Sequence, residues 1–250
     1  SSLLPIIYIK SFRDDTMAGR DLVSPPSPPR QAPAAPQSGR TPWQGVSLGG
    51  WLLLEPGPSK DLFQRHRLPA TRGREEGTVA RCEWELMQAM RGSKSALADL
   101  RKHRETFITR RDFERIQRMG LNAVRVPFGY WIVLGSTSND PYQGPALQYL
   151  DRAVKWAEEL GLQVLLDLHG APGGESAEAP CGHRQRAPKK WHWRQWRFNE
   201  SLKALDIVAR RYSSSPAVTG IALCNEPAKD VPIRTLCQFY TRGIRTVRNA

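Results

Sequence analysis

Residues 103–131 read HRETFITRRDFERIQRMGLNAVRVPFGYW and contain one complete step from a helix to a strand. Thr109 precedes a helical pattern over residues 110–119, and Asp112 follows Thr109 by three positions, which approximates a capping box. Gly120 comes directly after the helical pattern, in the position where glycine commonly ends a helix. The stretch therefore predicts a short, capped helix that leads into a new element.

The element that follows is the apolar run 121–126, LNAVRV, which predicts a strand that ends at Pro127 and Gly129. The same alternation of elements continues along the chain. We expect a strand over 45–54, a helical region over 80–101 broken at Gly92, a helix over 145–160 before a strand over 163–168, a helix over 197–212 before a strand over 218–223, and a last helix over 232–247.

Strands that alternate with helices in this way predict parallel βα units. We therefore expect an α/β fold of the (β/α)₈ TIM-barrel type, truncated to roughly the first four βα units. Residues 1–42, which are rich in Pro and Arg, predict a disordered leader. Residues 43–250 are then the N-terminal half of the barrel.

Composition narrows the possible functions. The apolar runs are too short to cross a membrane, so no membrane span is expected. The four cysteines form no C-x-x-C pair, and the five histidines are scattered, so we expect neither a metal site nor a cofactor. The net charge of +13 leaves open an acidic partner.

Polar residues follow each predicted strand, where a βα barrel builds its active site. The sharpest signal is Asn225-Glu226-Pro227, because a carboxyl group at a strand end can serve as the acid of glycoside hydrolysis. The same tripeptide could instead be a turn that begins a helix. The full set of candidates is Glu55, Arg125, Tyr130, Trp131, His169, Asn225 and Glu226.

Four motifs, in this order and spacing, carry a resemblance to a known family. They are GVSLGGWLLLEP at 45–56, RVPFGYW at 125–131, DLHGAPGG at 167–174 and GIALCNEP at 220–227. Together they resemble the exo-β-1,3-glucanase (glucan 1,3-β-glucosidase) branch of glycoside hydrolase family 5. The resemblance implies a retaining (β/α)₈ hydrolase that releases glucose from β-1,3-glucan.

The resemblance also implies a role for each matching residue. Glu226 is the general acid/base, and Asn225 contacts the sugar 2-hydroxyl. Arg125 supports the nucleophilic carboxylate, and His169 contacts the sugar in the cleavage subsite. Glu55 helps to bind the non-reducing-end glucose.

Two aromatic residues remain open between two roles. Tyr130 and Trp131 either belong to the core or stack on the sugar. We count both among the substrate-binding candidates.

The chain departs from the family pattern in two places. The loop GESAEAPCGHRQR at 174–186 replaces an Asn- and Asp-containing stretch of many relatives, and Glu175 or Glu178 could take over as acceptors of sugar hydroxyls. The nucleophile of the family follows strand seven, but Asp230 is the only acid after Glu226. We therefore expect no nucleophile in this chain, and we expect the chain alone to be inactive.

Two alternatives compete with the hydrolase. The first is a truncated or degenerate hydrolase that binds glucan without catalysis. The second is a nucleic-acid-binding protein, suggested by basic and aromatic residues in RQRAPKKWHWRQWR at 184–197, although a sugar platform or plain packing is favoured there. The family resemblance implies an extracellular or cell-wall location, but no signal peptide is visible. Oligomeric state is not predicted.

Overall fold

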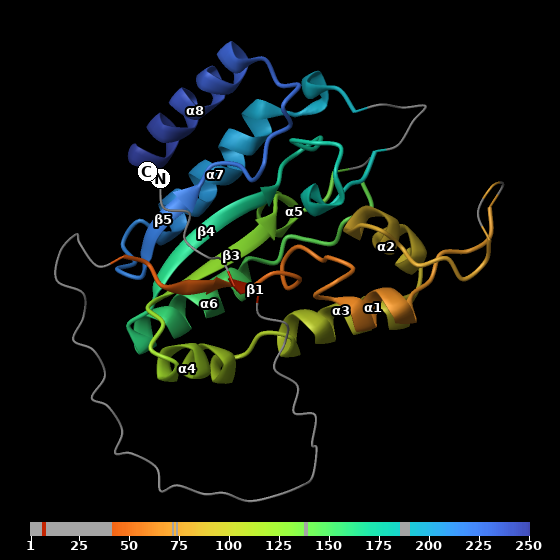
Figure 1. Cartoon of the computed structure of the whole chain (residues 1–250), viewed down its shortest axis with the longest axis horizontal. Coiled ribbons are helices and arrows are strands. Elements are labelled where there is room, and N and C mark those ends of the chain that lie inside the picture. The colour runs from red at the N-terminus through yellow and green to blue at the C-terminus, as the bar shows by residue number, and fades with distance from the viewer. Residues whose placement is uncertain (1–6, 9–41, 72, 74, 138–139, 186–190) are drawn as a thin grey trace, which may run out of the picture.

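The computed structural model describes residues 7–8, 42–71, 73, 75–137, 140–185 and 191–250. These residues form a parallel sheet flanked by helices (Figure 1). The strands follow one another across the sheet in chain order. They are β1 (Ile7–Tyr8), β2 (Gly45–Ser47), β3 (Ala123–Gly129), β4 (Gln163–Gly170) and β5 (Val218–Ala222).

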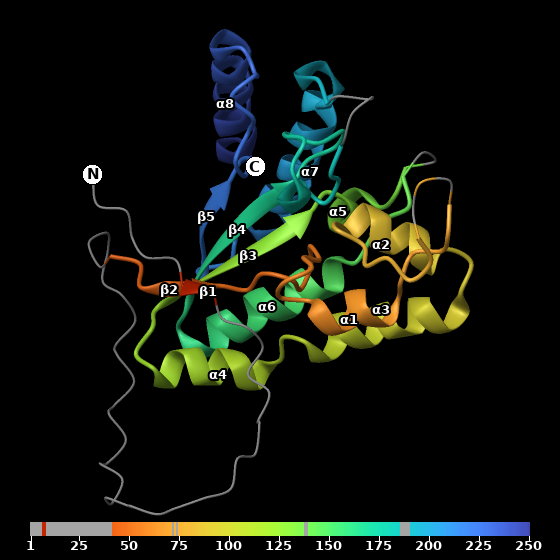
Figure 2. The same ribbon diagram turned by 45° about the vertical axis from the view of Figure 1, so that its right-hand side comes forward.

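The α-helices lie between or after the strands, as expected of βα units. They are α1 (Lys60–Arg65), α2 (Glu83–Met90), α3 (Lys94–Thr106), α4 (Arg110–Arg118), α5 (Trp131–Leu134), α6 (Leu147–Leu160), α7 (Phe198–Tyr212) and α8 (Ile233–Arg248). Two short 3₁₀ turns, η1 (Ala179–Cys181) and η2 (Trp193–Gln195), lie in the long connection after β4. Helices α4 and α6 lie side by side in both views, as do α7 and α8 (Figure 2).

The predicted α/β class is confirmed, and the parallel strand order is that of part of a (β/α) barrel. The described sheet has one strand more than the four expected, because β1 pairs with β2. Of the predicted leader, residues 1–42, only residues 7, 8 and 42 are described. The others lie outside the described residues, so the disordered leader stays a prediction.

Local signals located the helices well. Thr109 and Asp112 form the predicted capping box at the start of α4, and Gly120 follows α4 with φ of +79°. The break predicted at Gly92 separates α2 from α3, and Gly92 has φ of +77°. A residue without a Cβ adopts this left-handed conformation at little cost, which is why glycine ends these helices.

Two strand predictions were wrong in extent. The apolar run 45–54 contributes only the three residues of β2, and the rest of it is a buried loop. Strand β3 continues through Pro127 to Gly129 instead of ending at the proline. Residues two positions apart on a strand direct their backbone N–H and C=O groups to the same neighbouring strand. The Arg125 carbonyl accepts the Leu48 amide, just past the end of β2, so the backbone of Pro127 faces the β2 side as well. Because β2 has ended there, the missing N–H of Pro127 costs the sheet no hydrogen bond.

The register of the sheet places three polar residues on one face. Ser47 pairs with Arg125, and Pro127 pairs with Asp167. Side chains two positions apart on a strand point to the same side, so Ser47, Arg125 and Asp167 share a face. Large apolar side chains fill the rest of the core, and the fully buried ones include Trp51, Phe113, Phe128 and Trp131.

None of the helices in the described ranges is both long and apolar enough to cross a membrane.

Candidate active site

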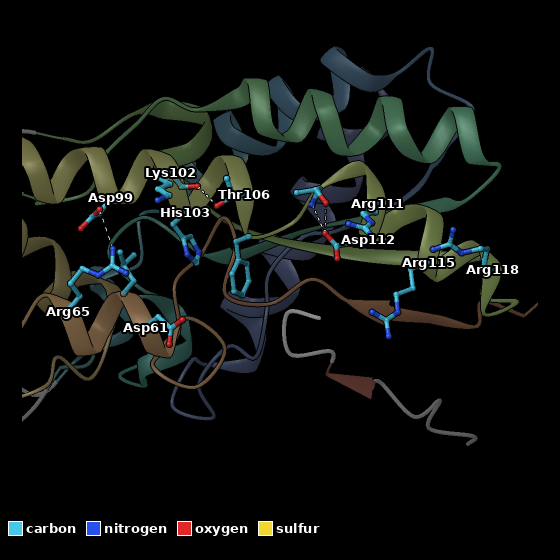
Figure 3. Close-up of a pocket in the computed structure, with 13 residues that line it drawn as sticks. Asp61, Arg65, Asp99, Lys102, His103, Thr106, Arg111, Asp112, Arg115 and Arg118 are labelled. Carbon is cyan, nitrogen blue, oxygen red and sulfur yellow. Dashed lines mark hydrogen bonds and ion pairs between the residues drawn. The ribbon is translucent and has the colours of Figure 1, made fainter. Parts of the chain in front are cut away.

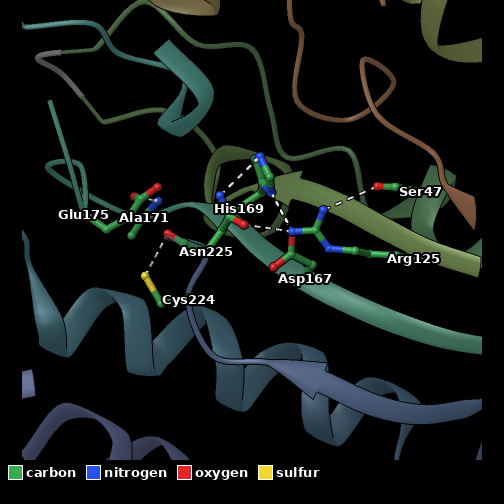
Figure 4. Close-up of polar contacts among 8 residues, drawn as sticks. All are labelled: Ser47, Arg125, Asp167, His169, Ala171, Glu175, Cys224 and Asn225. Atoms are coloured by element: carbon green, nitrogen blue, oxygen red, sulfur yellow. Dashed lines mark hydrogen bonds and ion pairs between the residues drawn. The ribbon is translucent and has the colours of Figure 1, made fainter. Parts of the chain in front are cut away.

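A polar network centred on Arg125 joins β3, β4 and the loop after β5 (Figure 4). Arg125 Nη2 lies 2.7 Å from Asp167 Oδ2 and donates to Asn225 Oδ1 at 2.8 Å. His169 Nδ1 is 2.7 Å from the same oxygen of Asp167. Arg125 Nη1 faces Ser47 Oγ at 3.4 Å. The fold thus brings together three of the residues that the sequence predicted, Arg125 from β3, His169 from β4 and Asn225 from the loop after β5.

The contacts hold His169 and Asn225 in place. His169 Nδ1 lies between two partners, 3.1 Å from Arg125 Nη2 and 2.7 Å from Asp167 Oδ2. Asn225 Oδ1 accepts from Arg125, and Asn225 Nδ2 lies 3.4 Å from His169 Nε2, so the Asn225 amide is oriented from both sides.

Asp167 is the functional residue that sequence reasoning missed. Its side chain is only 1% exposed, whereas that of Arg125 is 17% exposed. A buried carboxylate is tolerated only when cations and donors compensate its charge, and Arg125 and His169 do so. The available signal was its position as the one acid in the otherwise apolar strand QVLLDL.

Glu226 follows Asn225 directly in the chain and lines a cavity. The Asn225 amide donates to the Leu168 carbonyl at 3.1 Å and attaches the loop after β5 to the end of β4. Glu226 itself is exposed, and its φ of +40° is the only positive φ of a non-glycine residue among the described ones. Such a conformation costs free energy and persists where surrounding contacts hold it, typically at functional sites.

The cavity next to Glu226 has a volume of about 450 Å³, large enough for a sugar unit. Its walls come from the loop after β4 and the loop after β5. The lining includes Glu175, Glu178, Trp191, Asn225, Glu226 and Lys229.

Glu55 reaches the same centre from the loop after β2. Burial raises the pKa of its carboxyl, His169 and Arg125 oppose that rise, and the negative charge of Glu226 adds to it. These interactions show that Glu55 lies within electrostatic range of the three residues. The amide of Leu54, the residue before it, donates at 2.7 Å to the buried carboxylate of Glu83.

Tyr130 and Trp131 are buried. Tyr130 is 3% exposed, and its hydroxyl donates to the Asp140 carboxylate. Trp131 has no exposed surface, and Tyr142 stacks on it with ring centroids 3.7 Å apart. This packing favours the core interpretation of both residues over direct stacking on a sugar.

The two acids of the divergent loop differ in their surroundings. Glu175 is 1% exposed, and its Oε2 accepts the Ala171 amide at 2.8 Å. Burial raises the pKa of Glu175 to about 8, and the charges of Asp167 and Glu226 add to the rise. Glu178 is exposed and lines the cavity. Of the two, Glu178 is therefore the one that is accessible to a sugar hydroxyl.

Part of the basic and aromatic segment is also described, apart from residues 186–190. Trp191 and Trp196 are buried, and their indole N–H groups donate to the Gly174 carbonyl and to Ser201 Oγ. Stacking of nucleic acid bases needs exposed aromatic faces, which these two rings do not offer. Their positions favour packing.

A second cavity, of about 600 Å³, lies away from this network, along α1, α3 and α4 (Figure 3). It is lined mainly by charged side chains, among them Arg65, Asp99, Lys102, Arg111, Asp112 and Arg118. Within the described ranges, neither cavity nor any other region groups three His, Cys, Asp or Glu side chains that could hold a metal ion.

Comparison with known proteins identifies the family of this chain. Residues 88–250 match the sequence model of the cellulase family, glycosyl hydrolase family 5. The chain is 41% identical over 184 residues to the probable glucan 1,3-beta-glucosidase A of Aspergillus niger, which covers 74% of this chain and 41% of that protein. It is 36% identical over 211 residues to the glucan 1,3-beta-glucosidase of Blumeria graminis, with 82% and 46% covered. The chain thus spans less than half the length of these relatives.

Among solved structures, rutinosidase from Aspergillus niger superposes with a TM-score of 0.65 over 83% of this chain and 59% of that one. The sequence identity is 20%, so the likeness concerns the fold.

Proposed function

This chain belongs to the cellulase family, glycosyl hydrolase family 5, and on that premise we propose that it serves the retaining hydrolysis of β-1,3-glucan with release of glucose. The observation that carries the proposal is the position of Glu226 in a sugar-sized cavity beside an asparagine that Arg125 and His169 orient. The names of the glucan 1,3-beta-glucosidase relatives support the choice of substrate.

Glu226 is the proposed general acid/base. In the first step its carboxyl protonates the leaving glycosidic oxygen, and in the second its carboxylate takes a proton from water. Asn225 accepts from Arg125 through Oδ1, and one N–H of Nδ2 faces His169. The second N–H of the amide remains for a sugar hydroxyl. Glu55 and Glu178 are the proposed acceptors for further hydroxyls.

The retaining mechanism also needs a nucleophilic carboxylate about 5 Å from the acid. We assign that role to no described residue. Asp167 is bonded to Arg125 and His169, and Glu175 is bonded to the Ala171 amide. Asp230 lies on the same loop as Glu226. The second candidate function is the binding of glucan without catalysis, which uses the same cavity.

One experiment separates the two functions. Wild type and Glu226→Gln are incubated with laminari-oligosaccharides, glucose release is measured, and binding is followed by calorimetry. Loss of a general acid lowers turnover by roughly 10²–10⁴-fold, so hydrolysis predicts a drop of that size in the variant, with β-glucose as the first product. Binding with no release supports the non-catalytic alternative. If the chain neither binds nor cleaves these oligosaccharides, both functions are excluded.

A further inference from the structure

Glu175 connects the two loops that frame the cavity. Its side-chain Oε2 accepts the Ala171 amide at 2.8 Å, two residues beyond His169 in the loop after β4. Its main-chain carbonyl accepts the Ala228 amide at 2.9 Å, two residues beyond Glu226 in the loop after β5. One residue thus contacts both backbones that carry the proposed site.

The loop after β5 needs such support because Glu226 has an unfavourable backbone conformation, with φ of +40°. The hydrogen bonds from the Asn225 amide to Leu168 and from the Ala228 amide to Glu175 hold the residues on either side of it. The hydrogen bond to Leu168 depends on the position of strand β4. The hydrogen bond to the Glu175 carbonyl depends on the position of the turn formed by residues 171–175. The Glu175 side chain fixes that turn, since it closes back onto the Ala171 amide.

We propose that Glu175 is a positioning residue that joins the loop after β4 to the loop after β5 and thereby holds the Glu226 carboxyl in the cavity. The inference deepens the proposed function and rests on it for the role of Glu226. Glu175 is buried and bonded to the backbone, so it acts through Glu226 and not on the sugar.

The surroundings of Glu175 also make its charge matter. Burial raises its pKa to about 8, so at neutral pH the carboxyl is mostly protonated, and its ionisation places a second negative charge near Glu226. Titratable groups approach it from β4, from η1 and from the loop after β5. They are Asp167, Cys181, Cys224 and Glu226, with Glu178, Lys229 and Asp230 lining the same cavity.

Two variants separate the hydrogen bond from the charge. Glu175→Gln keeps an oxygen acceptor for the Ala171 amide and removes the ionisation, whereas Glu175→Ala removes both. Glu114→Gln, in α4 and paired with Arg110, is the matched control away from the cavity. Amide hydrogen exchange is measured at Ala171 and Ala228 in the whole chain.

In Glu175→Ala we expect both amides to exchange about tenfold faster or more, because a buried hydrogen bond is lost and the turn is released. In Glu175→Gln and Glu114→Gln both rates stay within about twofold of wild type, since the acceptor for the Ala171 amide remains. Faster exchange at Ala171 with unchanged exchange at Ala228 would overturn the proposal, because the two loops would then be independent.

A second measurement remains decisive if Glu175→Ala does not fold. The Glu175 carboxyl is followed by ¹³C NMR and identified by its absence in Glu175→Gln. We expect it to titrate near pH 8 in wild type and at lower pH in Glu226→Gln, which lacks the neighbouring charge. A titration that Glu226→Gln leaves unmoved would show that the two carboxyls are not held together.

Neither measurement requires turnover, so the proposal and the proposed function fail separately. If wild type neither binds nor cleaves laminari-oligosaccharides, the proposed function is wrong. Amide hydrogen exchange and the NMR titration then still test whether Glu175 connects the two loops. If wild type is active, Glu175→Ala should lower kcat more than it raises KM, because it displaces the acid and leaves the other sugar contacts in place. An unchanged kcat in a folded Glu175→Ala would contradict the positioning role.

Discussion

Two clusters of charged side chains lie beside cavities in this protein, and they differ in how their charges are held. In the polar network, Arg125 pairs with Asp167, and their side chains are 17% and 1% exposed. In the second cavity, along α1, α3 and α4, Arg65 pairs with Asp99, and their side chains are 58% and 28% exposed. This second cavity is the larger of the two, yet its charged residues make local contacts, such as the cap that Asp112 forms on α4.

The comparison shows that neither cavity size nor the number of charges marks the candidate site. In the exposed pair, water competes with the partner and the long side chains retain alternative rotamers. In the buried network, Asn225 contacts Arg125 through Oδ1 and His169 through Nδ2, and these two contacts fix its orientation. A site that must orient a substrate needs the second arrangement.

The largest difference between the two clusters is expected when the arginine of each is removed. Arg125→Ala leaves the Asp167 charge buried without its main partner, which costs about 3–5 kcal/mol of unfolding free energy. Arg65→Ala, the matched control, should cost about 0–1 kcal/mol because its pair is solvated. Urea denaturation at pH 7 measures both. Equal losses in the two variants would mean that the buried network is no more constrained than the surface.

Glycine substitutions compare the backbone of the two regions. Gly173 and Gly120 have φ of +82° and +79°, but a Cβ at Gly173 would lie 1.7 Å from the Gln195 carbonyl oxygen, whereas a Cβ at Gly120 meets nothing within 4 Å. Gly120→Ala should cost only the conformational strain, roughly 1–2 kcal/mol. Gly173→Ala should cost roughly 3 kcal/mol or more, because η2 must also shift. Thermal unfolding of both variants checks this, and similar losses would refute the close contact.

Buried and exposed acids should respond oppositely to pH. Burial raises the pKa of Glu83 to about 7, against the opposing effects of Arg104, the Leu54 amide and Trp131. The unfolded state therefore loses its proton first, and stability falls as pH rises from about 4.5 to about 7. Glu83→Gln removes this loss, so it should gain up to about 3 kcal/mol on wild type between pH 4.5 and pH 8.

Asp99→Asn is the contrasting variant for that experiment. Slight burial acts to raise the pKa of Asp99, but hydrogen bonds from Arg65 and His66 outweigh it and lower the pKa. The stability that Asp99 contributes is therefore present at neutral pH and lost as pH falls. Denaturation at several pH values compares the slopes. A Glu83→Gln difference that is constant with pH would show that Glu83 is not held protonated.

Much of the fold followed from the sequence because its signals are local. The capping box at Thr109 and the glycines after α4 and α6 depend on residues a few positions apart. Pro127 misled the strand prediction because its effect depends on whether the neighbouring strand still pairs there, and residue order does not state this.

The candidate site was predicted in part for the same reason. His169, Asn225 and Glu226 follow apolar runs and Arg125 lies within one, and neighbouring parallel strands bring such positions together. Asp167 was missed because nothing near it in the chain shows which partners neutralise its charge. Trp131 was left open between core and sugar because its burial depends on Tyr142 across the connection.

The sequence by itself determined the alternation of helices and strands, where most helices begin and end, and which motifs follow the strands. Only the tertiary structure decided the contacts among Arg125, Asp167, His169 and Asn225, the burial of Asp167 and Trp131, and the link that Glu175 makes between two loops. The reason is physical. Propensities and caps act over a few residues, whereas Arg125 and Asn225 are 100 positions apart and meet only because the strand register brings them together.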